Sequence, residues 1–134
     1  MVYKLIRDEQ GKGTGEFRAF TLRDQAQGHG LGFGDINGNG RGDFVLANGW
    51  LEAPEAPRTG EWIWHPELNL GSASIPILVA DINGNGRGDL IVGNGHGYGL
   101  DWYEQIVNAD GSREWRKHPI DPFNSQYHDM KWID

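Results

Sequence analysis

Apolar residues stand in short runs along this chain, and segments rich in glycine, asparagine and aspartate separate the runs. The runs contain many β-branched and aromatic residues, as at 44–46 and 77–79. No stretch of helix length places its apolar residues at helical spacing. Short apolar runs bounded by turn-forming residues are typical of β-strands. The pattern therefore predicts an all-β fold.

A verbatim internal repeat groups these strands into units. The nonapeptide Asp-Ile-Asn-Gly-Asn-Gly-Arg-Gly-Asp occupies residues 35–43 and occurs again, 46 residues later, at 81–89. The similarity continues after each copy, since Phe44–Gly49 matches Leu90–Gly95 and Glu61–Pro66 matches Glu114–Pro119. Repeats with a period of roughly 20–50 residues indicate supersecondary units that stack on one another.

Each unit is predicted to contain four strands, which we name A to D, with the nonapeptide between A and B. Strand A ends just before the nonapeptide, and strand B begins just after it. Strand C is expected near 50–51 and 100–105, and strand D near 61–66 and 113–120. Residues 3–7 and 16–22 are expected to be strands C and D of an earlier unit. Residues 130–133 are expected to be strand A of a later one, with Asp134 opening a third loop.

Four antiparallel strands per unit, at a period of about 50 residues, are typical of β-propeller blades. We expect a single repeat domain, 1–134, with a partial blade (1–27), blades at 28–70 and 71–121, and the start of another at 122–134. Propellers usually contain about 4–8 blades. The chain is therefore expected to be part of a longer protein or a homo-oligomer, preferably a dimer, that closes a ring. An open stack of two to three sheets is the structural alternative.

The nonapeptide places oxygen-bearing side chains at positions 1, 3, 5 and 9, with a backbone carbonyl available at position 7. This alternation wraps a short loop around a hard cation such as Ca²⁺, as in the EF-hand. A tight turn alone needs only one or two such residues. Because each loop carries two carboxylates, we expect weak binding, with a Kd of about 10⁻⁴–10⁻³ M. The candidate metal ligands are Asp35, Asn37, Asn39, the Arg41 carbonyl and Asp43 in the first loop, and Asp81, Asn83, Asn85, the Arg87 carbonyl and Asp89 in the second.

With these loops and their flanking strands, region 31–134 resembles FG-GAP/VCBS repeats, the blades of integrin α-subunit-type β-propellers. In that family, Asp-x-Asp-x-Asp-Gly-x-x-Asp loops between strands A and B bind calcium, whose role is mainly structural. The chain departs from the family by having asparagine at loop positions 3 and 5, which lowers the expected affinity. Our leading interpretation is a non-catalytic, calcium-binding propeller module that binds carbohydrate or another protein.

The histidines suggest an alternative function. His29 and His128 stand just ahead of predicted A strands, and His96 lies in a glycine-rich loop after strand B. Imidazoles gathered near a propeller axis can hold Zn²⁺ or transfer protons. The resemblance extends to fungal aldos-2-ulose dehydratases and to rhamnogalacturonan lyases, which implies a fragment of a carbohydrate-active lyase or dehydratase. His65 and His118 occupy matching strand D positions and are expected to pack.

Aromatic residues recur in the predicted strands and are expected mainly to form the packing between units. Tyr98 and Trp102 stand beside the glycine-rich loop, where exposed rings would offer a platform for a sugar.

Composition narrows the function classes further. The formal net charge is −7, which argues against a nucleic-acid partner. Cysteine is absent, so disulfides and thiolate metal sites are excluded. No apolar run approaches the roughly 20 residues of a membrane-spanning helix. Weak calcium sites suggest an extracellular origin, although the N-terminal residues do not form a signal peptide.

Overall fold

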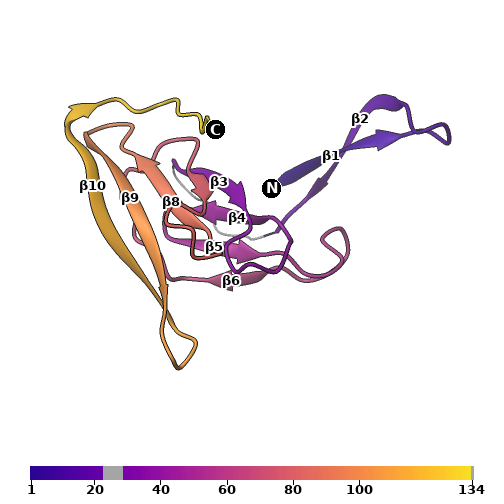
Figure 1. Ribbon diagram of the computed structural model, residues 1–134. Helices are drawn as coiled ribbons and strands as arrows, with labels where there is room; N and C mark the ends of the chain where they lie inside the picture. Colours follow the sequence, from indigo (N-terminus) through magenta and orange to yellow (C-terminus); the bar gives the residue numbers. More distant parts are fainter. Residues whose placement is uncertain (23–28, 134) are drawn as a thin grey trace.

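A computed structural model describes residues 1–22 and 29–133 of the chain. This part of the chain contains ten β-strands and no helix, so the predicted all-β class is confirmed (Figure 1). The strands are β1 (Val2–Arg7), β2 (Gly13–Phe20), β3 (Leu31–Gly34), β4 (Asp43–Leu46), β5 (Gly49–Glu52), β6 (Ile63–His65), β7 (Leu78–Ala80), β8 (Asp89–Gly93), β9 (Tyr98–Val107) and β10 (Arg113–Ser125).

The strands form three antiparallel sheets. The first sheet has the order β3-β4-β5-β6, the second has the order β7-β8-β9-β10, and β1 and β2 form a separate hairpin. Each four-stranded sheet follows chain order, with the nonapeptide between its first two strands. The predicted strands A to D of both repeats are therefore present in the predicted order.

The prediction of a further strand at 130–133 is wrong, because residues 126–133 contain no strand. A strand exists only where a neighbour's backbone groups pair with it, and this segment is held by isolated contacts such as the Tyr127 N–H to the Asn94 carbonyl, at 3.2 Å. Asp134, proposed as the start of a third loop, lies outside the described residues, as do residues 23–28.

The two four-stranded sheets meet along their first strands. Strands β3 and β7 lie side by side, and Gly32 of β3 forms a parallel bridge with Ile77, the residue just before β7. Glycine makes this approach possible, because a Cβ on Gly32 would lie 2.5 Å from the Ile77 carbonyl oxygen. A Cβ on Gly34 would lie 2.5 Å from the Val79 Cβ. The glycines of β3 therefore set the distance between the sheets.

The hydrophobic core fills the space between the facing sides of the two sheets. Val45 and Trp50 come from the first sheet, and Leu90 and Val92 from the second. All four are almost completely buried. The segment between the sheets closes the core with Leu68, Leu70, Ala73 and Ile77. The core therefore joins the two repeats into one packed body.

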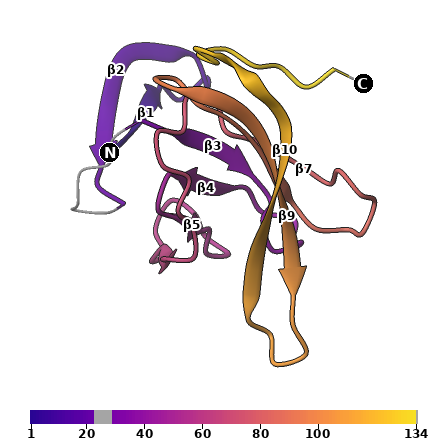
Figure 2. The same ribbon diagram turned by 90° about the vertical axis from the view of Figure 1, so that its left-hand side faces the viewer.

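Figure 2 shows strands β9 and β10 running to their shared turn, and in Figure 1 the β1–β2 hairpin extends away from the body. Its turn repeats the β9–β10 turn, since the Asp8 N–H donates to the Lys12 carbonyl as the Asn108 N–H donates to the Ser112 carbonyl. Gly11 and Gly111 take the same left-handed conformation in these turns. The turn of the hairpin therefore has the same backbone hydrogen bonding as the turn between strands C and D of the second sheet.

Candidate metal centres and the networks behind them

The first nonapeptide loop is organised around the carboxylate of Asp35. Its two oxygens accept backbone N–H groups of Gly38, Asn39 and Gly40 at 2.7–3.1 Å. Gly38 and Gly40 have φ angles of +74° and +79°, which favour glycine. The loop therefore folds back over its first carboxylate.

The asparagines of this loop form Asx turns along it. Asn37 Oδ1 accepts the Asn39 N–H at 3.3 Å, and Asn39 Oδ1 accepts the Arg41 N–H at 2.8 Å. Such local bonds fix the side-chain oxygens on the inside of a turn. The amide nitrogen of Asn39 is buried and has no hydrogen-bond partner within the described residues.

The second loop repeats this hydrogen bonding. Asp81 accepts the N–H groups of Asn85 and Gly86, Asn83 accepts that of Asn85, and Asn85 accepts that of Arg87. In the second loop, the side chains at loop positions 1, 3 and 5 are exposed, whereas the same positions of the first loop are half-buried. Because the second loop lies against the first, with Gly88 close to the Asp35 carbonyl, the first loop is the better shielded from solvent.

The ninth residue of each loop is fully buried and ties the loop to strand C. Asp43 accepts the N–H groups of Ile36 and Ala53, both at 2.9 Å. Burial raises the pKa of Asp43, the two N–H donors oppose this, and the carboxylates of Asp35 and Glu52 add to the rise. Burial therefore destabilises the ionised form of Asp43, and a nearby cation would stabilise that form.

Asp89 ties the second loop to strand β9. It accepts the N–H of Gln105, the counterpart of Ala53, at 2.8 Å, and the Trp102 indole N–H at 3.1 Å in place of a loop N–H.

The donor set of each loop fits a hard cation. Each loop offers two carboxylates, two amide oxygens and one backbone carbonyl, all oxygen ligands of the kind that calcium accepts. The Arg41 side chain is directed elsewhere, since its Nε donates to the Ala53 carbonyl at 2.9 Å. Within the described residues, no three His, Asp or Glu side chains are grouped so that they could hold a metal ion. A metal in these loops would therefore depend on the amide and carbonyl oxygens.

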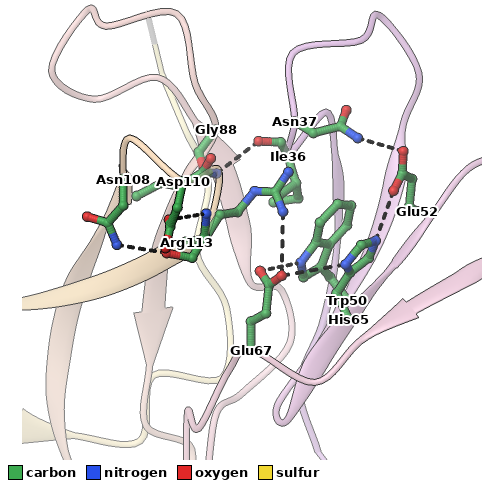
Figure 3. A network of polar contacts seen from close by, with 12 residues as sticks. Ile36, Asn37, Trp50, Glu52, His65, Glu67, Gly88, Asn108, Asp110 and Arg113 are labelled. Atoms are coloured by element: carbon green, nitrogen blue, oxygen red, sulfur yellow. Dashed lines mark hydrogen bonds and ion pairs between the residues drawn. The ribbon is translucent and has the colours of Figure 1, made fainter.

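A glutamate and a histidine stand behind each loop, and the sequence interpretation missed the glutamate. Asn37 Nδ2 donates to Glu52 at 2.9 Å, and the other Glu52 oxygen lies 2.8 Å from His65 Nε2 (Figure 3). The His65 ring stacks on Trp50 at 4.1 Å between ring centroids.

The second unit repeats this network. Asn83 Nδ2 donates to Glu104 at 3.3 Å, and His118 Nε2 lies 2.8 Å from Glu104. His118 stacks on Trp102 at 4.4 Å. The matching triplets Trp-x-Glu at 50–52 and 102–104 were the sequence signal for the two glutamates.

In the first unit the network reaches the second sheet. Glu67 accepts the Trp50 indole N–H at 3.1 Å and forms an ion pair with Arg113 at 3.4 Å. The Arg113 guanidinium also lies over the Trp50 ring, 5.1 Å from its centroid. Figure 3 shows His65 between Glu52 and Glu67. These contacts connect the first loop to strand β10.

Gln105 forms the second link between the repeats, and it is fully buried. Its side-chain amide donates to the carbonyls of Ile36 and Gly88, both at 2.9 Å. It therefore bridges the start of one nonapeptide loop and the end of the other.

The structure brings together the three histidines proposed to lie near one axis. The His96 ring lies 4.8 Å from that of His29 and 5.3 Å from that of His128, both edge-on. His128 also contacts Ser74 Oγ at 3.4 Å and Gln126 Oε1 at 3.1 Å. This arrangement is not one of the groups that could hold a metal within the described chain. The three imidazoles therefore lie close together, as expected, without forming a metal-holding group in the described part of the chain.

The two aromatic residues considered as a sugar platform have different surroundings. Tyr98 is 72% exposed. Trp102 is half-buried, stacks on His118 and donates to Asp89, so it acts in the second loop's network.

Comparisons with known proteins give no relative for this chain. No protein-family model matches it, and neither a curated protein nor a solved structure does. The described residues also contain no helix that is long and apolar enough to cross a membrane.

Proposed function

We propose that this protein is a calcium-stabilised, non-catalytic repeat module of the β-propeller type, in which loops 35–43 and 81–89 each hold one Ca²⁺. The observation that carries the proposal is that two loops of identical sequence adopt the same hydrogen-bonded turn, each with two carboxylates and two amide oxygens. The proposed ligands are Asp35, Asn37, Asn39, the Arg41 carbonyl and Asp43 in the first loop, and Asp81, Asn83, Asn85, the Arg87 carbonyl and Asp89 in the second.

The proposed role of the metal is structural. Position 9 of each loop is already tied to strand C, and position 1 holds the turn between strands A and B. A cation between them would fix three strands of a sheet at once. It would also relieve the repulsion among the carboxylates of Asp35, Asp43 and Glu52, which contributes to the raised pKa of Asp43.

The propeller assignment rests on the arrangement of the sheets. Two four-stranded antiparallel sheets follow the chain in A-to-D order, and their first strands lie parallel and side by side. This is the relation expected of successive blades around an axis. The separate hairpin, which corresponds to strands C and D, supports a third unit of the same series.

Thermal unfolding with calcium and with chelator tests this proposal. At a Kd of about 10⁻⁴–10⁻³ M, 10 mM calcium is expected to stabilise the fold by about 1.4–2.7 kcal/mol per site. Asp35→Asn combined with Asp81→Asn removes one carboxylate from each loop, so the rise in Tm is expected to disappear.

Asp110→Asn is the matched control, because Asp110 also accepts a backbone N–H within its own turn, that of Ser112 at 2.9 Å, but lies in the β9–β10 turn. This variant should keep the calcium-dependent rise. An equal Tm of the unchanged protein in calcium and in chelator would contradict the proposal, as would an undiminished rise in the loop double variant.

A further inference from the structure

The first sheet has an aromatic face that no part of the described chain covers fully. Phe33, Phe44 and Trp62 lie next to one another on it, with successive ring centroids 5.2 Å apart. Phe33 is 62% exposed. We call these three residues the Phe33 face.

The repeat identifies what this face corresponds to. The residues of the second sheet at the same repeat positions are Val79, Leu90 and Trp115. The tryptophans correspond because each stands three residues before the strand D histidine that pairs with strand C. Leu90 is fully buried in the core between the sheets, and Val79 and Trp115 pack against it. The Phe33 face is therefore the counterpart of a surface that is buried elsewhere in the same molecule.

The second sheet also has a counterpart of the first-sheet surface against which Leu90 packs. Val45 and Trp50 form the first-sheet side of the core, and their counterparts on the second sheet are Ile91 and Trp102. Both counterparts are only half-buried, so they lie on the outer side of the second sheet.

The first part of segment 126–133 continues this outer side. A Cβ on Gly93 would lie 2.4 Å from the Tyr127 Cβ and 3.1 Å from the Met130 sulfur. Trp132, by contrast, lines a groove together with Leu31 and Phe33. We call Ile91, Trp102, Tyr127 and Met130 the outer surface.

The hairpin leaves room over the Phe33 face. A cavity of about 830 Å³ separates Val2, Tyr3 and Phe20 of the hairpin from Phe33 and Trp62. Val2 and Phe20 form a register pair on the hairpin side of this cavity. The hairpin therefore lines the cavity without packing against the strands of the first sheet.

We propose that the Phe33 face binds a second copy of this chain, which contributes its outer surface. The proposed contact between two molecules is of the same kind as the packing between the two sheets within one molecule. It rests on the proposed function only in treating the sheets as successive units of one repeat series, and it does not require calcium.

The chemistry of both surfaces favours this partner. One chain carries two different apolar surfaces, and the core between its own sheets shows how surfaces of these two types fit. Such a contact is heterologous, so it leads to a closed ring or to an open chain of copies. A second copy also covers exposed strand edges that otherwise pair indiscriminately.

Absolute mass measured by light scattering tests the proposal, with Phe33→Asp damaging one surface and Met130→Asp the other. Phe33 is 62% exposed, and Met130 is half-buried in a segment without strand structure, so both variants are expected to fold, which near-ultraviolet circular dichroism checks. The unchanged protein should have at least twice the mass of one chain, and each variant alone the mass of one. An equimolar mixture should give a species of two chains, because each variant keeps the surface that the other lacks.

Phe17→Asp is the matched control, since Phe17 is as exposed as Phe33, at 62%, but lies on strand β2 of the hairpin, outside both surfaces and outside the cavity over the Phe33 face. It should keep the mass of the unchanged protein. A single-chain mass for the unchanged protein at high micromolar concentration overturns the proposal. So does a Phe33→Asp variant with unchanged mass, or a mixture that contains only single chains.

The same samples separate this proposal from the calcium proposal. If calcium raises the Tm of Phe33→Asp but the substitution leaves the mass unchanged, the interface is wrong and the calcium proposal stands. If the masses follow the expected pattern while calcium leaves every Tm unchanged, the interface stands and the calcium proposal is wrong.

Discussion

Glu52 Oε2 lies 2.8 Å from His65 Nε2, although the two residues stand on different strands and 13 positions apart. Glu104 and His118 repeat the relationship at the same distance, 14 positions apart. In each case the other carboxylate oxygen accepts the amide of the asparagine at loop position 3. Each candidate metal loop is thus connected to the strand D histidine through one glutamate.

Replacing Glu52 with alanine is expected to destabilise the fold. The change removes the partner of both Asn37 and His65, and groups left without partners in partly buried sites cost about 1–3 kcal/mol. Urea denaturation monitored by tryptophan fluorescence measures the loss. Glu55→Ala is the control, because Glu55 is exposed and should change stability by less than about 0.5 kcal/mol. Equal denaturation midpoints for the two variants would contradict a structural role of Glu52.

Replacing Asn39 with aspartate is expected to tighten calcium binding by about tenfold or more, because affinity in such loops rises with the number of carboxylates. The change also removes the buried amide nitrogen that has no partner. Isothermal titration calorimetry measures the Kd directly. Asn48→Asp adds the same charge at an exposed position outside the loops and should leave the Kd nearly unchanged. If both variants bind equally, general charge and not the loop governs binding.

Replacing Gly34 with alanine is expected to separate the two sheets. The new Cβ would meet Val79, and such overpacking costs about 1–3 kcal/mol. Adding Val79→Gly removes the Cβ in the way together with its methyl groups, so the double variant should be more stable than the two single losses added together predict. Gly11→Ala serves as control, since its Cβ would meet nothing and only the backbone conformation would be strained. Chemical denaturation of these four variants and the unchanged protein provides the test, and additive losses would contradict it.

The turn at 121–127 is expected to depend on pH at both ends of the scale. Asn124, the Tyr127 hydroxyl and the Phe123 N–H donate to Asp121 and hold its pKa well below the usual range. The turn's stabilisation is therefore complete above the ordinary aspartate pKa and is lost as pH falls through the lower folded value. Asp121 in turn raises the pKa of Tyr127, so the contact is complete below the ordinary tyrosine pKa and is lost as pH rises through the raised value.

Nuclear magnetic resonance of the Tyr127 ring follows both transitions. Tyr127→Phe should abolish the alkaline transition and leave the acid one, which then has to be followed at Asn124. Asp121→Asn should lower the pKa of Tyr127 toward its ordinary value. An unchanged alkaline transition in that variant would show that the contact does not form in solution.

The strands and the loop positions were predictable because each depends on local sequence. Short apolar runs and glycine-rich turns act over a few positions, and the verbatim nonapeptide marks the boundary between strands A and B. The Glu52–His65 pairing was not predictable in the same way, since it depends on the register between strands β5 and β6. Segment 130–133 matched strand A in sequence, yet it is no strand, because pairing depends on a neighbour that sequence similarity does not supply.

The hydrogen bond from the Gln105 side chain to the Ile36 carbonyl could not be predicted from the sequence either. The corresponding position in the first unit is occupied by Ala53, which has no side-chain amide, so the repeat gave no indication of it. Long-range contacts between the units depend on positions at which the two units differ in sequence. A comparison of the two repeats shows where they agree, so it does not identify those positions.

The glycines of β3 also make the two repeats non-interchangeable, despite their identical nonapeptides. Gly32 and Gly34 correspond to Leu78 and Ala80 of the second unit. A chain built by duplicating the second unit would therefore place side chains where β3 has none, and its neighbouring strands would have to stand further apart. The units in any array built from this sequence therefore have a fixed order. The distance between neighbouring sheets would alternate along the array, short at one junction and longer at the next.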